Sequence, residues 1–230
     1  NFLTINAYKI NYEPKTIEIK IEVINKETRL ELFLNRDNQT EDLDKFKVLI
    51  LPNVLSMSSK EIERIRNYVA NGGSVYASKY TSLFSSEDGK RDDFGLADVF
   101  GLRYLGETEE AISYMAPAAN SGIDWLKDYS LEKPLCAMGR QIKCRLSSNT
   151  QIISNLVLPY TNPDDPWIFS SIHSNPPGKK TDYITAAIQN YGKGRCVYFA
   201  ADIERVPYFG KIFANIISSL SPEPFFFKVK

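Results

Sequence analysis

The stretch KVLILPNVLSMSSKEIERIRNYVANGGSVYASKYTSLF, residues 47–84, decides the fold class. Residues 48–51 are apolar at consecutive positions, which is typical of a strand buried on both faces of a parallel sheet. A second apolar run, at 75–77, predicts another strand. Apolar residues at helical spacing separate the two strands: Ile62, Ile65, Tyr68 and Val69. A strand, a helix and a strand in this order predict a right-handed, parallel βαβ unit.

Both ends of the predicted helix carry their own signals. Ser58 and Glu61 have the spacing of a capping box, in which each side chain accepts a hydrogen bond from the backbone N–H of the other residue. At the far end, the Asn-Gly-Gly run at 71–73 predicts a left-handed stop. The sequence therefore predicts where this helix begins and where it ends.

The segments on either side of this unit predict further strands. Residues 16–34 alternate apolar and charged side chains on both sides of a polar turn, which predicts a β-hairpin. Short strands, including 140–146 and 150–158, favour an antiparallel extension of the sheet or a small β lobe. A Gly-Lys-Gly turn at 192–194 is expected to join two later strands.

Two further helices are expected. One lies within 90–104, where Asp92 or Asp93 is placed to cap it and Gly101 to end it. The last helix is expected within 208–220. The tail that follows alternates apolar residues like the beginning of another strand, and the first residue is not methionine. We therefore expect the chain to be a piece of a longer protein.

The composition excludes several classes of partner. Lysine plus arginine and aspartate plus glutamate both number 28, so the net charge is zero and no long-range field recruits nucleic acid or an anionic membrane. No apolar run approaches the roughly 20 residues that cross a bilayer. The three cysteines and His173 lack metal-ligand spacing, and no cofactor is expected. The cysteines are expected to be buried and free, with one disulfide as the alternative. No targeting signal follows Asn1, so the sequence indicates no compartment.

Four segments together resemble a known domain: residues 46–78, RDDFGLADVFG at 91–101, SIHSNPPG at 171–178 and YGKGRCVYFAADIER at 191–205. In this order they are similar to the class I glutamine amidotransferase-like domain of bacterial glycoside hydrolases. That domain is best known as the trimerisation domain of family 42 beta-galactosidases, and it recurs in fucosidase-like hydrolases. The resemblance implies a flavodoxin-like α/β fold, placed between a catalytic barrel and a small β-sandwich.

The resemblance also locates the amidotransferase nucleophile, a cysteine in a Gly-x-Cys-x-Gly turn that a histidine and a carboxylate activate. Here that turn holds Ser78 and Lys79, and no cysteine follows until Cys136. The segment FAADIER, where the family keeps its histidine, contains Asp202 and Glu204 but no histidine. The resemblance therefore implies a degenerate nucleophile position and no catalytic residue.

Two groups of residues are candidates for binding. Asp202 and Glu204 follow a strand, where they are expected to flank a ligand, to bind Arg205 or to cap the last helix. The second group lies in the proline-rich loop 159–180, which is long enough to be functional. Its candidates for an interface or for a sugar contact are Trp167, Phe169 and His173.

These observations predict an α/β protein with a flavodoxin-like three-layer sheet and an antiparallel extension. We expect residues 1–40 to form an N-terminal hairpin and connector, 41–221 the amidotransferase-like domain, and 222–230 the start of a following β domain. The expected function is that of a non-catalytic domain of a carbohydrate-active enzyme, which supports a homo-oligomer or walls the active site of a catalytic barrel in the same polypeptide. The alternatives are an independent carbohydrate-binding module and a divergent hydrolase or amidase with Ser78 or Cys196 as its nucleophile.

Overall fold

The structure is a computed structural model of the 230-residue chain. The residues that it describes are 17–23, 26–32, 43, 46–119, 121–161, 165, 167–171 and 175–221. The predictions made for the N-terminal connector, for His173 and for the tail 222–230 fall outside these residues.

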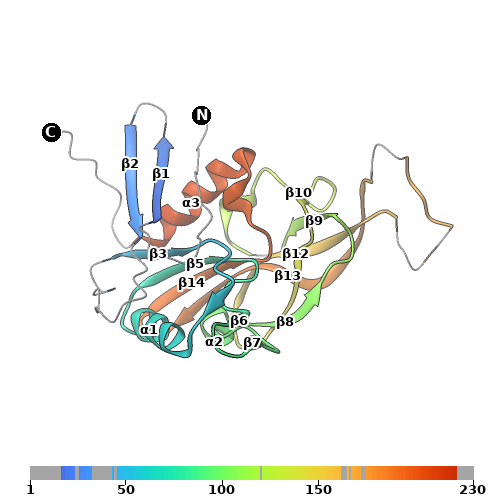
Figure 1. Cartoon of the computed structure of the whole chain (residues 1–230). Coiled ribbons are helices and arrows are strands. Elements are labelled where there is room, and N and C mark those ends of the chain that lie inside the picture. Colours follow the sequence, from blue (N-terminus) through green and yellow to red (C-terminus); the bar gives the residue numbers. More distant parts are fainter. Residues whose placement is uncertain are drawn as a thin grey trace.

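A mixed sheet of nine strands forms the centre of the molecule (Figure 1). Its main path runs in the order β10-β9-β12-β13-β14-β5-β3, and β11 pairs with β13 and β8. Strands β14, β5 and β3 are parallel, whereas the remaining pairings described in this sheet are antiparallel, so the predicted antiparallel extension is confirmed. The strands are β3 (Val48–Leu51), β5 (Ser74–Ser78), β8 (Leu102–Glu107), β9 (Ile112–Pro117), β10 (Leu135–Met138), β11 (Ile142–Leu146), β12 (Gln151–Pro159), β13 (Pro177–Tyr191) and β14 (Gly194–Phe199).

Strands β3 and β5 and helix α1 (Ser59–Ala70) form the predicted βαβ unit. Both strands are buried along their whole length, as consecutive apolar residues require. The capping box is confirmed: the Glu61 N–H donates to Ser58 Oγ at 3.2 Å, and the Ser58 N–H donates to Glu61 Oε2 at 2.7 Å. At the other end Asn71 is right-handed, and Gly72 adopts the positive φ, +118°.

Two apolar clusters lie on opposite faces of the parallel strands. Helix α1 packs on one face through the four residues that the sequence predicts: Ile62, Ile65, Tyr68 and Val69. Helix α3 (Gly210–Leu220) covers the other face, and Figure 1 shows the two helices on opposite sides of the sheet. Successive residues of β5 alternate between the clusters, with Val75 in the first and Tyr76 in the second. This half of the molecule therefore has three layers.

The second predicted helix is shorter than expected. Helix α2 spans only Ala97–Phe100, and no side chain caps it. The prediction that Asp92 or Asp93 caps this helix is wrong, because the Asp93 carboxylate accepts from the backbone N–H of Tyr104 at 2.8 Å. Asp93 therefore ties the segment to β8 instead. Gly101 ends the helix in the left-handed region, at φ +67°, as predicted.

Strands β12 and β13 extend as a long hairpin that projects from the body of the molecule (Figure 1). Strand β12 reaches Pro159 and β13 begins at Pro177, so the predicted loop is too long at both ends. We refer to the connection between these strands, residues 160–176, as the arm. The error at the second end has a simple reason: the residues that begin β13 are polar and exposed, so no apolar pattern marks them as a strand.

Smaller elements complete the described fold. Strands β1 (Ile17–Val23) and β2 (Lys26–Leu32) pair in antiparallel fashion, as the alternation predicts. The others are the strands β4 (Ser56–Met57), β6 (Phe84–Ser85) and β7 (Gly89–Lys90), which form one small sheet, and the 3₁₀ helices η2 (Asp124–Leu126), η3 (Ile203–Arg205) and η4 (Pro207–Phe209). None of the helices in the described ranges is both long and apolar enough to cross a membrane.

Candidate functional site

The first candidate site lies where the parallel strands β5 and β14 end. The chain turns sharply after Ser78, the last residue of β5, because Lys79 has a φ of +51°, which is uncommon for a residue with a side chain. Two hydrogen bonds hold this turn. The Lys79 N–H donates to the Phe199 carbonyl at 2.8 Å, and the Tyr198 hydroxyl donates to the Lys79 carbonyl at 2.6 Å. Strand β14 therefore fixes the backbone at the position where the resemblance places the nucleophile.

Ser78 is fully buried and has its hydrogen-bonding partners within the protein. Its hydroxyl donates to Glu204 Oε1 at 2.6 Å, and its Oγ accepts from the Asn53 N–H at 3.0 Å. The Tyr76 hydroxyl donates to the second oxygen of the carboxylate, Glu204 Oε2, at 2.7 Å. Glu204 itself is only 5% exposed. We refer to Tyr76, Ser78 and Glu204 as the Glu204 cluster.

Burial governs the ionisation of this cluster. It raises the pKa of Glu204, while the hydrogen bonds from Ser78 and Tyr76 act in the opposite direction by stabilising the carboxylate. Burial also raises the pKa of Tyr76 well above its ordinary value, and the charge of Glu204 adds to the shift. Tyr76 therefore stays protonated and acts as a donor. Because two hydroxyl groups donate to one carboxylate, the cluster ties β5 to η3 and presents no reactive group.

A set of charged residues lies beside this cluster. Lys79 Nζ is 3.5 Å from Asp202 Oδ1, and Arg205 Nη1 is 3.3 Å from Asp202 Oδ2. Asp202 thus binds Arg205, as one of the sequence alternatives has it, whereas α3 has no side-chain cap. Asp202 and Glu204 follow β14 rather than lying in it, and their carboxylates bind different partners within the protein.

Among the described residues, the strand ends offer no exposed nucleophile. Ser78 has no exposed surface, and its proton is directed at a carboxylate. Cys144 and Cys196 are buried, and burial raises the pKa of both thiols, which disfavours the reactive thiolate. All three cysteines are free, so the alternative of a disulfide is wrong; Cys136 is exposed, so the expectation of burial is wrong for that residue. In the same described ranges, no group of three His, Cys, Asp or Glu residues is placed to hold a metal ion.

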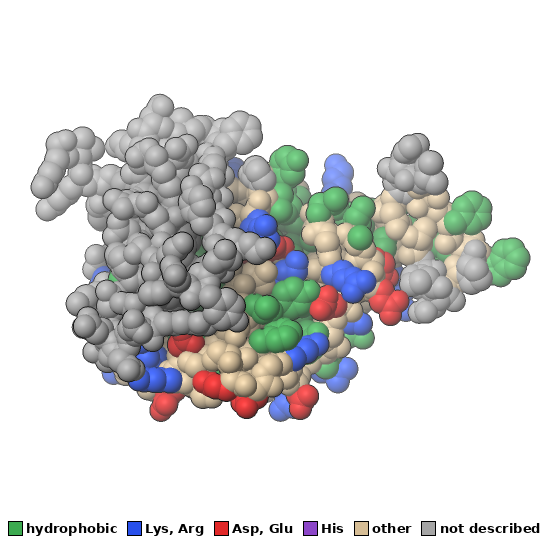
Figure 2. All heavy atoms as spheres, in the orientation of Figure 1, with side chains coloured by type: hydrophobic (Ala, Val, Ile, Leu, Met, Phe, Trp, Pro, Cys, Tyr) green, Lys and Arg blue, Asp and Glu red, His purple; other side chains and the backbone are tan. Residues whose placement is uncertain are grey.

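The loop candidates lie on the arm, apart from the Glu204 cluster. Trp167 is 86% exposed and Phe169 is 79% exposed. Asp165 holds the local turn, since its Oδ1 accepts from the Trp167 N–H at 3.0 Å. Figure 2 shows hydrophobic side chains at the outer end of this projection. His173, the third candidate, lies outside the described residues. Two exposed aromatic rings on one projecting segment are typical of a surface that contacts a partner.

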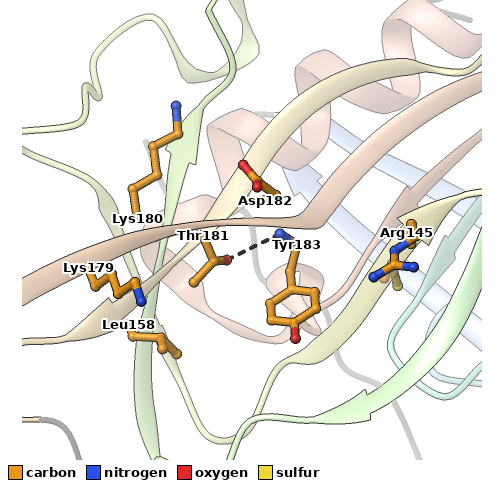
Figure 3. Close-up of a pocket in the computed structure, with 8 residues that line it drawn as sticks. Arg145, Leu158, Lys179, Lys180, Thr181, Asp182 and Tyr183 are labelled. Atoms are coloured by element: carbon orange, nitrogen blue, oxygen red, sulfur yellow. Dashed lines mark hydrogen bonds between the residues drawn. The ribbon is translucent and has the colours of Figure 1, made fainter.

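The sequence did not predict a cavity of about 440 Å³ that lies beside β13 (Figure 3). Its lining comes mainly from β11 and β13 and includes Arg145, Lys179 and Tyr183. One signal was available: residues 179, 181 and 183 share one face of a strand, but only if 177–183 is assigned as strand rather than loop.

Solved structures with a similar fold include two hydrolases. The chain matches a beta-galactosidase from Rahnella sp. R3 over 77% of its length, with a TM-score of 0.54 and 19% identity. The fold is similar to part of a glycoside hydrolase. An alpha-L-fucosidase, isoenzyme 2 from Paenibacillus thiaminolyticus, matches over 80% of the chain, with a TM-score of 0.56 and 18% identity. The matched region spans only 23% and 26% of these two hydrolase chains.

A third match has a different extent. A cytoplasmic protein from Salmonella typhimurium has a TM-score of 0.56 and 10% identity, and the match covers 91% of this chain and 96% of that protein. Neither a protein-family model nor a curated protein sequence matches the chain. At these identities the similarity shows the fold alone. The fold thus occurs both within long hydrolase chains and as nearly the whole of a shorter protein.

Proposed function

We propose that this chain is a non-catalytic domain of a glycoside hydrolase of the beta-galactosidase or fucosidase kind, which supports assembly of the enzyme and walls the active site of its catalytic barrel. The observation that carries the proposal is the match to about a quarter, or less, of two long hydrolase chains. The Glu204 cluster supports the non-catalytic part of the proposal. A catalytic nucleophile must be accessible to substrate, whereas Ser78 and Glu204 are both buried and are hydrogen-bonded to each other.

The finer fold that we propose is flavodoxin-like, of the class I glutamine amidotransferase kind. Three parallel strands with α1 on one face and α3 on the other support it. So does the left-handed turn at Lys79, directly after the central parallel strand. A turn of this kind presents the nucleophile in hydrolases with a nucleophile elbow. The proposed domain therefore keeps the frame of an amidotransferase without its chemistry.

The arm is the proposed contact with a second copy of the chain or with the catalytic barrel. Trp167 and Phe169 expose large apolar rings, and association removes such rings from water. Aromatic residues are enriched at the buried centres of interfaces, where a few of them carry most of the binding free energy. His173 is included in this proposed contact because it lies within residues 160–176 of the sequence. Contact between Trp167 and a sugar is a second use of the same surface.

Sedimentation velocity tests the assembly role. We expect the wild-type chain to associate with increasing concentration, and a variant with Trp167→Ala and Phe169→Ala to remain a monomer. Leu131→Ala is the matched control, because Leu131 is an apolar residue that is 47% exposed outside the arm. A wild-type chain that stays monomeric, or a double variant that associates normally, contradicts the assembly role.

The non-catalytic part has its own test. We expect the chain to show no glutaminase and no glycosidase turnover above background. Turnover that disappears on Ser78→Ala or Cys196→Ala would overturn the proposal in favour of the divergent hydrolase, which the burial of both residues disfavours.

A second function, that of an independent carbohydrate-binding protein, is favoured by one observation. The match to the Salmonella protein covers 96% of that protein, so the fold also occurs without an attached hydrolase domain. A protein of this kind binds sugar with no barrel present. Sugar binding by a chain that neither associates nor has a covalently linked barrel would favour this function over the first.

A further inference from the structure

The cavity beside β13 lies on the antiparallel half of the sheet, away from the Glu204 cluster. Its volume of about 440 Å³ falls within the range of roughly 300–1,000 Å³ that is usual for small-molecule sites. Strand β13 supplies most of the lining, β12 supplies Leu158, and β11 supplies Cys144 and Arg145.

The lining of this cavity has two sides, because successive side chains of a strand point to opposite faces. Figure 3 shows Lys179, Thr181 and Tyr183 on one side of β13, and Lys180 and Asp182 on the other. The carboxylate of Asp182 therefore points away from the ammonium group of Lys179. The side of β13 that carries Tyr183 thus presents one cation of this strand, Lys179, and no carboxylate from it.

Further cations lie on the same face of the sheet as Tyr183. Lys143 Nζ lies 5.7 Å from the centre of the Tyr183 ring. Arg145 stands directly opposite Arg103 in the antiparallel pair of β11 and β8, and both side chains are exposed. Like charges directly opposite each other destabilise a sheet. None of the ion pairs formed between described residues involves Lys143, Lys179, Arg103 or Arg145. Such an unpaired concentration of positive charge, in a chain of zero net charge, points to an anionic ligand.

The same cavity has an apolar and aromatic wall. Leu158 and the ring of Tyr183 line it together. Thr181 Oγ1 accepts from the Tyr183 N–H at 3.2 Å and donates to the Leu156 carbonyl at 3.0 Å, so the backbone that carries the ring is held in place. An aromatic ring and an aliphatic side chain each suit the C–H face of a sugar ring, and guanidinium and ammonium groups suit a carboxylate.

We propose that this cavity binds an acidic saccharide, a sugar that carries a carboxylate. Arg145 and Lys179 lie at opposite ends of the lining (Figure 3), so each binds a carboxylate of the saccharide, and sugar rings pack against Tyr183 at one end and Leu158 at the other. The site rests on the proposed carbohydrate-related function, for which it names the ligand class. A concave site with an aromatic wall favours a saccharide over an acidic segment of a protein, which the test below treats as a separate outcome.

Calorimetric titration of the 230-residue chain tests this site, with digalacturonate as the probe and the neutral disaccharide galactobiose as its size-matched control. We expect digalacturonate to bind at least about tenfold more tightly than galactobiose at low ionic strength, and to weaken as salt is added. Arg145→Ala and Lys179→Ala should each weaken the binding of digalacturonate by about tenfold, since each removes a charge-assisted hydrogen bond. Lys60→Ala is the matched control, because this exposed lysine of α1 lies outside the lining of the cavity. It should change the affinity by less than about twofold.

Several results would overturn this site. They are no binding of digalacturonate, equal affinity for the two disaccharides, or an equal loss in Lys60→Ala and Lys179→Ala. Inorganic sulfate that binds as tightly as digalacturonate would show a simple anion site, and polyglutamate that binds more tightly through Arg145 and Lys179 would show a surface for an acidic protein. Sedimentation separates this inference from the proposed function. A monomeric chain that binds digalacturonate contradicts the assembly role alone, and an associating chain that does not bind it contradicts the saccharide site alone.

Discussion

The polar and aromatic side chains of the two halves of the sheet differ in whether they have partners within the chain. At the ends of the parallel strands, Tyr76, Ser78 and Glu204 satisfy one another, and Asp202 binds two cations of the same chain. In the antiparallel half, the arm exposes Trp167, and the cavity beside β13 collects cations that the described residues leave unpaired. Polar and charged groups that already have partners within the chain gain little binding free energy from a ligand, whereas groups without such partners can gain more.

This difference teaches where to look for function in such a fold. Ligands of open α/β sheets usually bind at the carboxyl ends of the parallel strands. Here that location is filled by side chains of the protein itself, with Ser78 and Glu204 at its centre. We therefore expect changes in the parallel half to act mainly on stability, and changes in the antiparallel half to act mainly on binding.

The largest expected effect is that of Glu204→Ala. This change leaves the buried hydroxyl groups of Tyr76 and Ser78 without their acceptor, and each such loss costs about 1–3 kcal/mol, so the free energy of unfolding should fall by roughly 2–6 kcal/mol. Chemical denaturation measures it. Glu204→Gln, which keeps the side-chain volume and one acceptor oxygen, should cost clearly less; equal losses in the two variants would show that the hydrogen bonds contribute little.

The next effect concerns the layer that α1 adds to the parallel strands. Ile65 is buried in the cluster between α1 and the sheet, so Ile65→Ala should lower the free energy of unfolding by about 2–5 kcal/mol through lost packing and the cavity left behind. Denaturation by urea checks this value. Glu63→Ala, on the exposed face of the same helix, is the control and should change stability by less than about 0.5 kcal/mol. An unchanged midpoint for Ile65→Ala means that this face of α1 does not carry the core.

A smaller effect depends on pH. Burial raises the folded-state pKa of Glu204 above the ordinary glutamate value of 4.5, so the folded protein holds this proton more tightly than the unfolded chain does. Protonation of Glu204 therefore adds to the free energy of unfolding. This contribution is fully present below pH 4.5 and is lost as the pH rises through the folded-state pKa. Glu204→Gln does not titrate. The stability of the wild type relative to Glu204→Gln should therefore decrease as the pH rises above 4.5, as measured by denaturation at a series of pH values. A difference that increases with pH would contradict the direction of the shift.

The smallest expected effect on stability is that of Trp167→Ala. The side chain is 86% exposed, so its removal should change the free energy of unfolding by less than about 0.5 kcal/mol. Thermal melting checks this expectation, with Ile65→Ala as the reference that melts early. If Trp167→Ala melts as early as Ile65→Ala, Trp167 is a part of the core. Changes in the antiparallel half would then affect stability as strongly as changes in the parallel half.

The sequence predicted the elements whose signals are local. Helix α1 is marked by a capping box of four residues and by its apolar spacing, so its start and its buried face are confirmed. The Glu204 cluster has no local signal, because Ser78 and Glu204 are 126 positions apart and meet only after β14 pairs with β5. The beginning of β13 was missed for a related reason. Lys179 and Lys180 are exposed there, and their strand conformation comes from pairing with β12 rather than from their own pattern.

Strand β13 belongs to both halves, and its length has a mechanical consequence. It has 15 residues, and at about 3.3 Å per residue it spans on the order of 50 Å. Residues 186–188 have hydrogen-bonded neighbours on both edges, β12 and β14, whereas residues 177–180 pair with β12 alone. Amide protons should therefore exchange with solvent increasingly fast towards the arm. A load applied at the arm would pull along the axis of this strand, and its first yielding point would be the singly paired segment that carries Lys179.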